Sequence, residues 1–300
     1  PGIVIDRVNT ELEEYGLKFA PDPASDEQSS IGGMIGNSST GANSVKYGRP
    51  EKYAQEMDVV LGDGSLVTVR DIALDSEEWN EIVEKDDLEA EIYQTVREKI
   101  EEHEDLIEER FPKHHRLSSG YNLPFVVREN EDGEKVINLS KLFVGSEGTL
   151  GIVVSATYAL VDPVDDPCIL VYHYHSLKEA MQAVPVALDI DATAVELMDK
   201  DLFDLARDQV EYSHLAEPFP EDSAAALMVQ FDTEVTDDLK AKAEEANEIL
   251  LEDGDAYFVN EAFTPEDKDE LWALRKAAIP LLMGMKGDPK PYPFIEDVAV

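Results

Sequence analysis

The sequence contains one cysteine, Cys168, among 300 residues. An internal disulfide cannot form, and a zinc or iron–sulfur site built from several thiolates is excluded within these residues. A chain that relies on no disulfide is typical of a reducing compartment, so we expect a cytoplasmic location.

Basic residues are scarce: 25 Lys and Arg stand against 66 Asp and Glu, a net charge of -41. Such a surface repels nucleic-acid phosphates and anionic lipids, which argues against both as partners. The excess is spread along the chain, and 43% hydrophobic residues favour a packed fold over disorder. This composition resembles that of halophilic proteins.

Long apolar runs and a signal peptide are also lacking. Residues 277–285 form an apolar stretch far shorter than the ~20 residues that span a membrane, so we expect no transmembrane segment. The length suggests about two domains. Neither end resembles a domain edge, and we expect a fragment of a longer protein.

Turn and periodicity signals predict the elements of the first half. Residues 57–69 predict a hairpin around Gly62, Asp63 and Gly64, and Asp132 with Gly133 marks a second hairpin. The acidic stretch 75–110 predicts one or two surface helices, with His103 in their apolar stripe. Residues 141–161 indicate a strand, a glycine-rich turn and a strand.

In the second half, apolar runs alternate with helical patterns. This order predicts a two-layer α+β domain, with the boundary between Pro163 and Pro167. The predicted strands are 169–175, 194–198, 225–231 and 256–260, and the predicted helices are 176–188, 200–210, 237–251 and 266–283.

Four windows contain no acid: 28–50, 111–128, 148–161 and 273–287. Burial in a strand explains 148–161. The others combine small polar residues with cations such as Arg49 and Arg128, which favours an anionic ligand over plain burial.

The glycine cluster at 31–48 exposes main-chain N–H groups that suit a pyrophosphate. Its spacing matches neither a Rossmann fingerprint nor a P-loop. Ser146 lacks the spacing of a hydrolase nucleophile. His173 and His175 can share a strand face, but no third ligand lies nearby, so we expect no metal site.

Three segments together, at 19–48, 118–123 and 142–157, resemble FAD-linked oxidases of the vanillyl-alcohol oxidase and p-cresol methylhydroxylase type. VELMDKDL from Val195, ELWALRKA from Glu270 and the final PFIEDVAV are similar to the cap domain of the D-lactate, glycolate and D-2-hydroxyglutarate dehydrogenase branch. The C-terminal sequence is most similar to long members that carry an iron–sulfur region.

The resemblance implies an α+β fold. Residues 1–162 would form part of a PCMH-type FAD-binding domain, with its first subdomain missing and a helical insertion at 75–110. Residues 163–300 would form a truncated α+β cap with an antiparallel sheet. The iron–sulfur cysteines and the divalent-metal ligands with the general base would follow Val300.

The resemblance also implies the cofactor, FAD, and its site residues. Arg275 would bind the substrate carboxylate, with Tyr121 and Asn122 near the flavin. The residues implied to contact FAD are Pro23, Ala24, Ser25, Ile31, Gly32, Gly33, Gly36, Asn37, Ser38, Gly41, Gly48, Arg116, Glu147, Gly148, Gly151, Ile152 and Val153.

The implied activity is oxidation of a D-2-hydroxy acid to its 2-keto acid by hydride transfer to FAD. A quinone or a protein would accept the electrons, and the oligomeric state stays open. Two alternatives remain: a cofactor-free α+β interaction or scaffold module, and a flavin reductase of the same fold type.

The net charge generates a prediction about salt. Because ~1 M salt shortens the Debye length to ~3 Å, it should screen the self-repulsion of a chain with net charge -41. We expect the melting temperature to rise between low and molar KCl, measured by circular dichroism. A flat or falling melting temperature would remove the halophilic interpretation.

Overall fold

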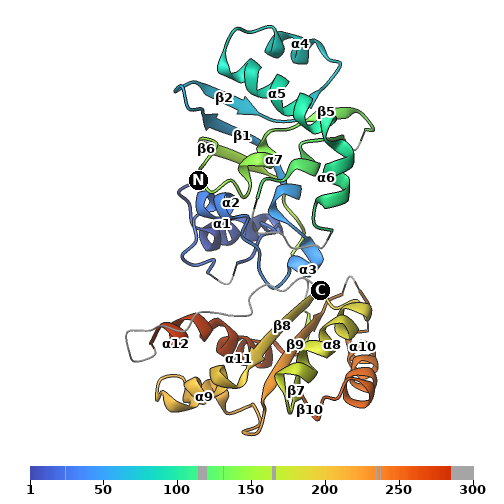
Figure 1. Ribbon diagram of the computed structural model, residues 1–300. Helices are drawn as coiled ribbons and strands as arrows, with labels where there is room; N and C mark the ends of the chain where they lie inside the picture. The colour runs from blue at the N-terminus through green and yellow to red at the C-terminus, as the bar shows by residue number, and fades with distance from the viewer. Residues whose placement is uncertain are drawn as a thin grey trace. The chain divides into compact units, whose positions relative to one another are not determined.

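The structure is a computed structural model that describes residues 1–23, 25–113, 120–130, 132–163, 167–233, 235–236 and 238–284. The chain divides into two compact units, Pro1–Pro163 and Val164–Val300 (Figure 1). Each unit is described by itself.

The first unit contains a three-stranded antiparallel sheet in the order β2-β1-β6. Its strands are β1 (Ala54–Val60), β2 (Leu66–Val69) and β6 (Ile152–Tyr158). Gly64 takes a φ of 89° in the turn between β1 and β2, so the predicted first hairpin is confirmed.

A second sheet has the order β3-β5-β4 and contains the predicted second hairpin. Its strands are β3 (Ile72–Ala73), β4 (Val127–Glu129) and β5 (Lys135–Ile137). The strand predicted from residue 141 is wrong: Ser140–Phe143 form a short helix, α7. A short buried apolar run does not distinguish helix from strand, and the Asn138 side chain accepts from the Ser140 amide to start the turn.

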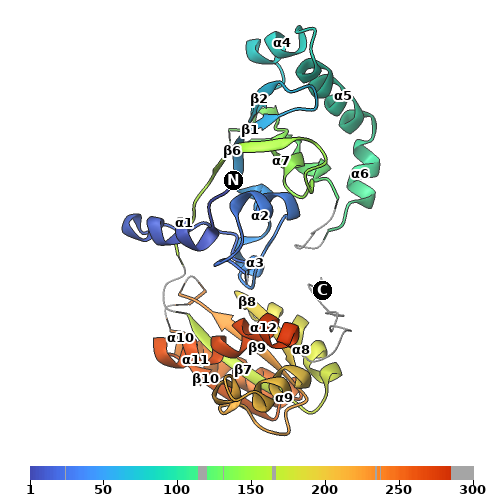
Figure 2. The same cartoon turned by 90° about the vertical axis from the view of Figure 1, so that its left-hand side faces the viewer.

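The acidic insertion forms three helices, so the predicted one or two is corrected. They are α4 (Glu77–Val83), α5 (Leu88–Glu102) and α6 (Glu104–Arg110), with α4 and α5 seen near β2 in Figure 2. Tyr93 and Ile100 are buried in the core of the unit. His103 instead lies exposed at the break between α5 and α6.

The remaining helices of the first unit support the glycine-rich segment. They are α1 (Ile5–Leu12), α2 (Ile31–Asn37) and α3 (Ser44–Tyr47), with 3-10 turns at Glu13–Tyr15, Pro50–Lys52 and Leu123–Phe125. Ile31, Met34 and Ile35 anchor α2 in the same core as β1 and β6.

The second unit is built on a four-stranded sheet in the order β10-β7-β9-β8. All its neighbouring strands are antiparallel, so the predicted antiparallel sheet is confirmed. The strands are β7 (Cys168–Tyr174), β8 (Ala194–Asp199), β9 (Ala225–Phe231) and β10 (Phe258–Ala262).

Helices cover both faces of this sheet (Figure 1). On one face lie α8 (Leu177–Asp189) and α10 (Leu239–Asn247), which continues as a π-helix at Glu248–Asp253. On the other lie α9 (Lys200–Asp208) and α11 (Pro265–Lys276), with a 3-10 turn at Ser213–Ala216. The prediction of two layers is therefore wrong. Every residue of β7 and β9 is buried, as in a strand covered on both sides.

The last predicted helix begins as expected and then breaks. Thr264 caps α11 by accepting from the Asp267 amide, and Pro265 occupies the first position. The chain breaks at Ala277 before α12 (Ala278–Gly284). Among the helices of the described residues, none has the length and apolar content to cross a membrane.

His173 lies buried in β7 with both ring nitrogens hydrogen-bonded. Nδ1 is 2.9 Å from Ser223 Oγ and Nε2 is 2.8 Å from Asn260 Oδ1. Burial lowers its pKa to about 4. His175 stacks flat on Tyr257 instead. Both side chains are thus held by packing partners.

The lowered pKa of His173 predicts an acid-sensitive second unit. The unfolded chain takes up this proton near pH 6.5, whereas the fold resists it down to about pH 4. The unfolding free energy is therefore unaffected by protonation of His173 above pH 6.5. It falls by roughly 3 kcal/mol in all as the pH decreases from 6.5 toward 4. Between pH 7 and pH 4, wild type should lose that much more unfolding free energy than His173→Gln.

Urea unfolding in a Trp79→Phe background, with Trp272 as the reporter of the second unit, measures the difference. Equal pH slopes for the two proteins would contradict the assignment.

Candidate functional site

The glycine-rich segment begins as a short helix and ends in an unusual backbone conformation. The Ser30 hydroxyl accepts from the Gly33 amide at the start of α2. Ser38, at its end, takes a left-handed φ of 51°. The left-handed conformation is common at the end of a helix, but a non-glycine residue there carries a conformational cost, and such costs cluster at functional sites. The segment therefore marks a candidate site.

A very close main-chain approach follows at Gly41. A Cβ atom added there would lie 1.7 Å from the carbonyl oxygen of Asp22, so only glycine fits. Asn43 donates to the Asp22 carboxylate, and burial raises the pKa of that carboxyl. The loop containing buried Pro23 is thereby held against the glycine-rich segment.

The GSEG turn joins the end of α2 through two main-chain hydrogen bonds. The Gly145 amide donates to Ile35 O at 2.8 Å, and the Glu147 amide donates to Gly36 O at 2.9 Å. Glu147 takes a φ of 52° and Gly148 a φ of 73°. These bonds bring two of the three predicted cofactor segments together.

The third segment, from Gly120 to Asn122, meets the same junction. A Cβ atom added at Gly145 would contact both Gly120 O and Ser38 Cβ at 3.4 Å. The Tyr121 side chain is 43% exposed, and its hydroxyl lies 2.9 Å from Thr149 Oγ1. The structure therefore brings all three segments to one place within the first unit.

Asn122 is buried, whereas its neighbour Tyr121 is exposed. Its amide donates to Val144 O at 2.8 Å, and its oxygen accepts from Arg49 Nη2 at 2.8 Å. With both polar atoms bonded internally, Asn122 fixes the junction, whereas Tyr121 presents its ring to the surroundings.

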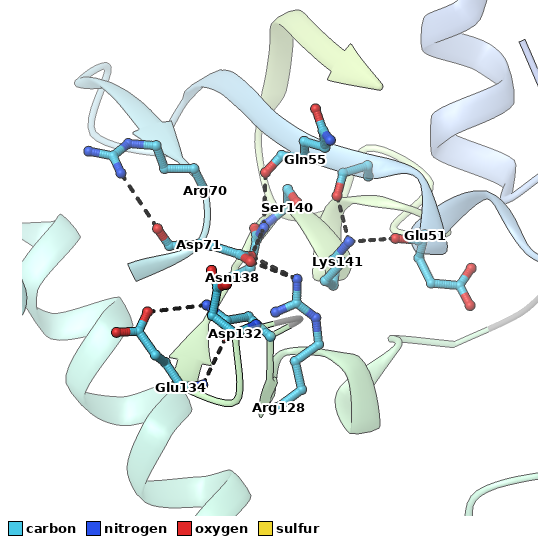
Figure 3. A network of polar contacts seen from close by, with 12 residues as sticks. Glu51, Gln55, Arg70, Asp71, Arg128, Asp132, Glu134, Asn138, Ser140 and Lys141 are labelled. Carbon is cyan, nitrogen blue, oxygen red and sulfur yellow. Dashed lines mark hydrogen bonds and ion pairs between the residues drawn. The ribbon is translucent and has the colours of Figure 1, made fainter. Parts of the chain in front are cut away.

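A buried polar network continues from Arg49, and most of it was missed from the sequence. Arg49 pairs with Glu51, whose carboxyl pKa is raised by burial. Lys141 donates to the carbonyls of Glu51 and Ala54 (Figure 3). Burial lowers the Lys141 pKa to about 8.

Asp71 is the second acid of the network. It accepts from Arg128 Nη2 at 2.9 Å and from Asn138 Nδ2 at 2.7 Å (Figure 3). The acid-free windows predicted an anionic ligand for their cations. Arg49 pairs with the nearby Glu51 and Arg128 with the distant Asp71, while Arg128 Nη1 has no partner among the described residues, so the predicted anionic ligand stays a prediction. Both cations line a pocket of about 1560 Å³.

Ser38 is one of several described residues with a buried, unpartnered side-chain polar atom, and it lies at the junction. Its side chain is 3% exposed, and Oγ has no hydrogen-bond partner among the described residues. An unpaired buried hydroxyl costs free energy unless a partner satisfies it. A ligand oxygen at the junction would provide that partner, so the segment fits a polyoxygenated ligand.

The other predicted contacts lie around this junction or beyond the described residues. A Cβ atom added at Gly151 would lie 2.7 Å from Val60 O, and Ile152 is 69% exposed on β6. Ser25 bonds Ser29. Predicted residues Ala24 and Arg116 fall outside the described residues. The remaining predicted contacts are Gly32 and Asn37 in α2, Gly48 after α3, and Val153 in β6.

In the second unit, Arg275 pairs with an acid from a distant strand. Its Nε and Nη2 both lie 2.7 Å from Glu196 Oε2. The two predicted cap motifs, VELM on β8 and LWALR on α11, therefore meet through this ion pair. Within the described parts of the chain, no group of three or more His, Cys, Asp or Glu side chains is placed to hold a metal.

Comparison with known proteins identifies both parts of the chain. Residues 1–70 match the family model of an FAD binding domain, and residues 166–300 match that of the FAD linked oxidases, C-terminal domain. A D-2-hydroxyglutarate dehydrogenase of Pseudomonas putida is 28% identical over all of this chain and 30% of its own length. Glycolate oxidase subunit GlcD of Bacillus subtilis is 25% identical over all of this chain and 50% of its own.

The chain thus spans about 30% of the length of the first of these relatives. The solved structure of alkyldihydroxyacetonephosphate synthase has a TM-score of 0.57 at 17% identity, covering 93% of this chain and 41% of the other. That likeness concerns the fold.

The contact between Gly41 and Asp22 generates a stability prediction. Gly41→Ala forces the two main chains apart and should cost about 1–3 kcal/mol of unfolding free energy. Gly36→Ala, on α2 with open space around it, is the matched control and should be neutral or gain up to about 1 kcal/mol. Urea unfolding followed by Trp79 fluorescence, with Trp272→Phe as background, measures both. Equal effects would disprove the close approach.

Proposed function

Because the chain belongs to the FAD-linked oxidases, we propose that it is part of a flavin-dependent dehydrogenase that converts a D-2-hydroxy acid to its 2-keto acid. The observation that carries the proposal is the convergence of three segments on the unpaired Ser38 hydroxyl. D-2-hydroxyglutarate, D-lactate and glycolate are the candidate substrates. A quinone or protein electron acceptor and a cytoplasmic location complete the proposal.

The residues present at the junction fit FAD. The main chain at Gly36 has open space around it, which lets a phosphate approach closely. Ser38 Oγ would donate to a cofactor oxygen, and Tyr121 offers an exposed ring beside the Glu147 turn. These groups bind and orient, and FAD when bound supplies the hydride acceptor.

Arg275 would hold the substrate carboxylate. A planar guanidinium offers parallel N–H donors to two carboxylate oxygens, which fixes the orientation of the Cα–H bond. The Arg275 side chain is 26% exposed, so donors remain accessible beside its contact with Glu196. The role of this chain in the reaction is therefore positioning.

We expect the FAD to be bound without a covalent link. No histidine or cysteine lies in the described glycine-rich segments at 31–48 and 145–153, where attachment would be expected. Acid precipitation of the protein made from the complete gene should release yellow flavin to the supernatant. Flavin retained by the pellet would contradict the non-covalent link, and a colourless protein that ignores added FAD would contradict the proposed function.

Arg275→Ala tests the substrate site. Loss of a charge-assisted contact should lower kcat/KM by roughly 30- to 1000-fold on every 2-hydroxy acid that wild type oxidises. Arg275→Lys should have a kcat/KM between those of Arg275→Ala and wild type, because an ammonium group cannot form the planar pair of hydrogen bonds that a guanidinium forms.

The neighbouring exposed cation provides the control: Lys276→Ala should leave kcat/KM within threefold. Flavin content is measured for each variant. If flavin content is unchanged and Arg275→Ala lowers kcat/KM less than about threefold, Arg275 is not the carboxylate ligand.

A further inference from the structure

Glu196 is a carboxylate turned toward the interior of the second unit. On β8, Val195 and Leu197 pack with the helices of one face, whereas Met198 packs with those of the other. Alternation along a strand places Glu196 on the side of Met198, which is the side of α11. Its side chain is 17% exposed, in a chain whose acids mostly coat the surface.

Arg275 meets Glu196 through one edge of its guanidinium: Nε donates a hydrogen bond to Oε2, and Nη2 makes an ion-pair contact with the same oxygen. Nε carries a single N–H, and the neighbouring N–H of Nη2 points the same way. Both lie 2.7 Å from Glu196 Oε2. The other edge, formed by Nη1 and the second N–H of Nη2, makes no hydrogen bond or ion pair within the described parts of the chain and is left for another acceptor.

We infer that Glu196 is a positioning residue that holds Arg275 by one edge of its guanidinium and aims the opposite edge at the substrate carboxylate. The inference rests on the proposed function. An arginine free on its helix would sample several rotamers, and fixing it would remove that entropy cost from substrate binding. Glu196 also sits on rigid strand backbone, where β8 pairs with β9 through Val195 and Leu197.

Charge supports this role in a chain of net charge -41. A lone arginine near the protein interior would be neutralised by any mobile acid nearby. Glu196 pairs with Arg275 from a fixed position on β8 and leaves the second edge of the guanidinium unoccupied. The pair is neutral as a whole, so an incoming carboxylate meets donor N–H groups rather than a net negative charge.

Glu196→Gln tests the inference in the FAD-loaded protein made from the complete gene. Glutamine keeps one acceptor oxygen but removes the charge that fixes the fork. We expect KM for D-2-hydroxyglutarate or D-lactate to rise about tenfold with kcat within about threefold. The Kd for oxalate, a carboxylate probe that is not oxidised, should rise equally in isothermal titration calorimetry.

Two further variants control the measurement. Glu245→Gln removes the acid of a surface ion pair with Lys242 and should change neither constant. Glu196→Asp keeps the charge on a shorter stem and should give a smaller rise than Glu196→Gln. Trp272 fluorescence melting shows whether each variant folds.

A double-mutant cycle separates positioning from a general structural role. In an Arg275→Ala background, Glu196→Gln should have no further effect on KM or on the oxalate Kd. An equal effect in both backgrounds would overturn the inference, as would an unchanged oxalate Kd. A tighter oxalate Kd would overturn it too, because Glu196 would then compete with the substrate.

The same cycle distinguishes a failure of the Glu196 inference from a failure of the proposed substrate site at Arg275. If Arg275→Ala weakens oxalate binding and turnover but Glu196→Gln changes neither, only the inference fails. If Arg275→Ala itself leaves both unchanged, the substrate site of the proposed function fails and the inference with it.

Discussion

Two main-chain hydrogen bonds, from Gly145 and Glu147 to the last turn of α2, hold the candidate site together. Beside these bonds, Ser38 and Glu147 take left-handed backbone, which L residues disfavour. The glycine-rich segment, the GSEG turn and the Tyr121 segment each depend on that junction for their place. The conformational cost is offset by the buried core of α2, so a rigid scaffold supports an open main-chain surface.

The buried polar network beneath the junction explains how this scaffold stays rigid. Arg49, Asn122 and Lys141 connect the chain around residue 50 to the segments at 122 and 141. Buried charges in such a network are costly when unpaired and specific when satisfied. In a strongly acidic chain, these internal cations order the fold.

Much of the fold followed from the sequence because its signals are local. The Gly64 turn, the Thr264 cap and the apolar runs of β7 and β9 each predict their element directly. The burial of β7 and β9 on both faces was not predicted, because it depends on helices that are distant in the sequence. An unbroken apolar run is nevertheless the sequence signal of a strand that is covered on both faces. The pairing of Arg275 with Glu196 has no local signal, because the two residues lie 79 positions apart in the sequence.

Hydrogen–deuterium exchange on the protein made from the complete gene, with and without FAD, tests the central claim most directly. The amides of 31–41, 120–122 and 145–153 should all exchange more slowly when FAD is bound, since the junction makes them one surface. The peptides of α4 and α5, which lie in the same unit but outside the junction, should exchange at unchanged rates. FAD binding that leaves these three segments unprotected would contradict the account.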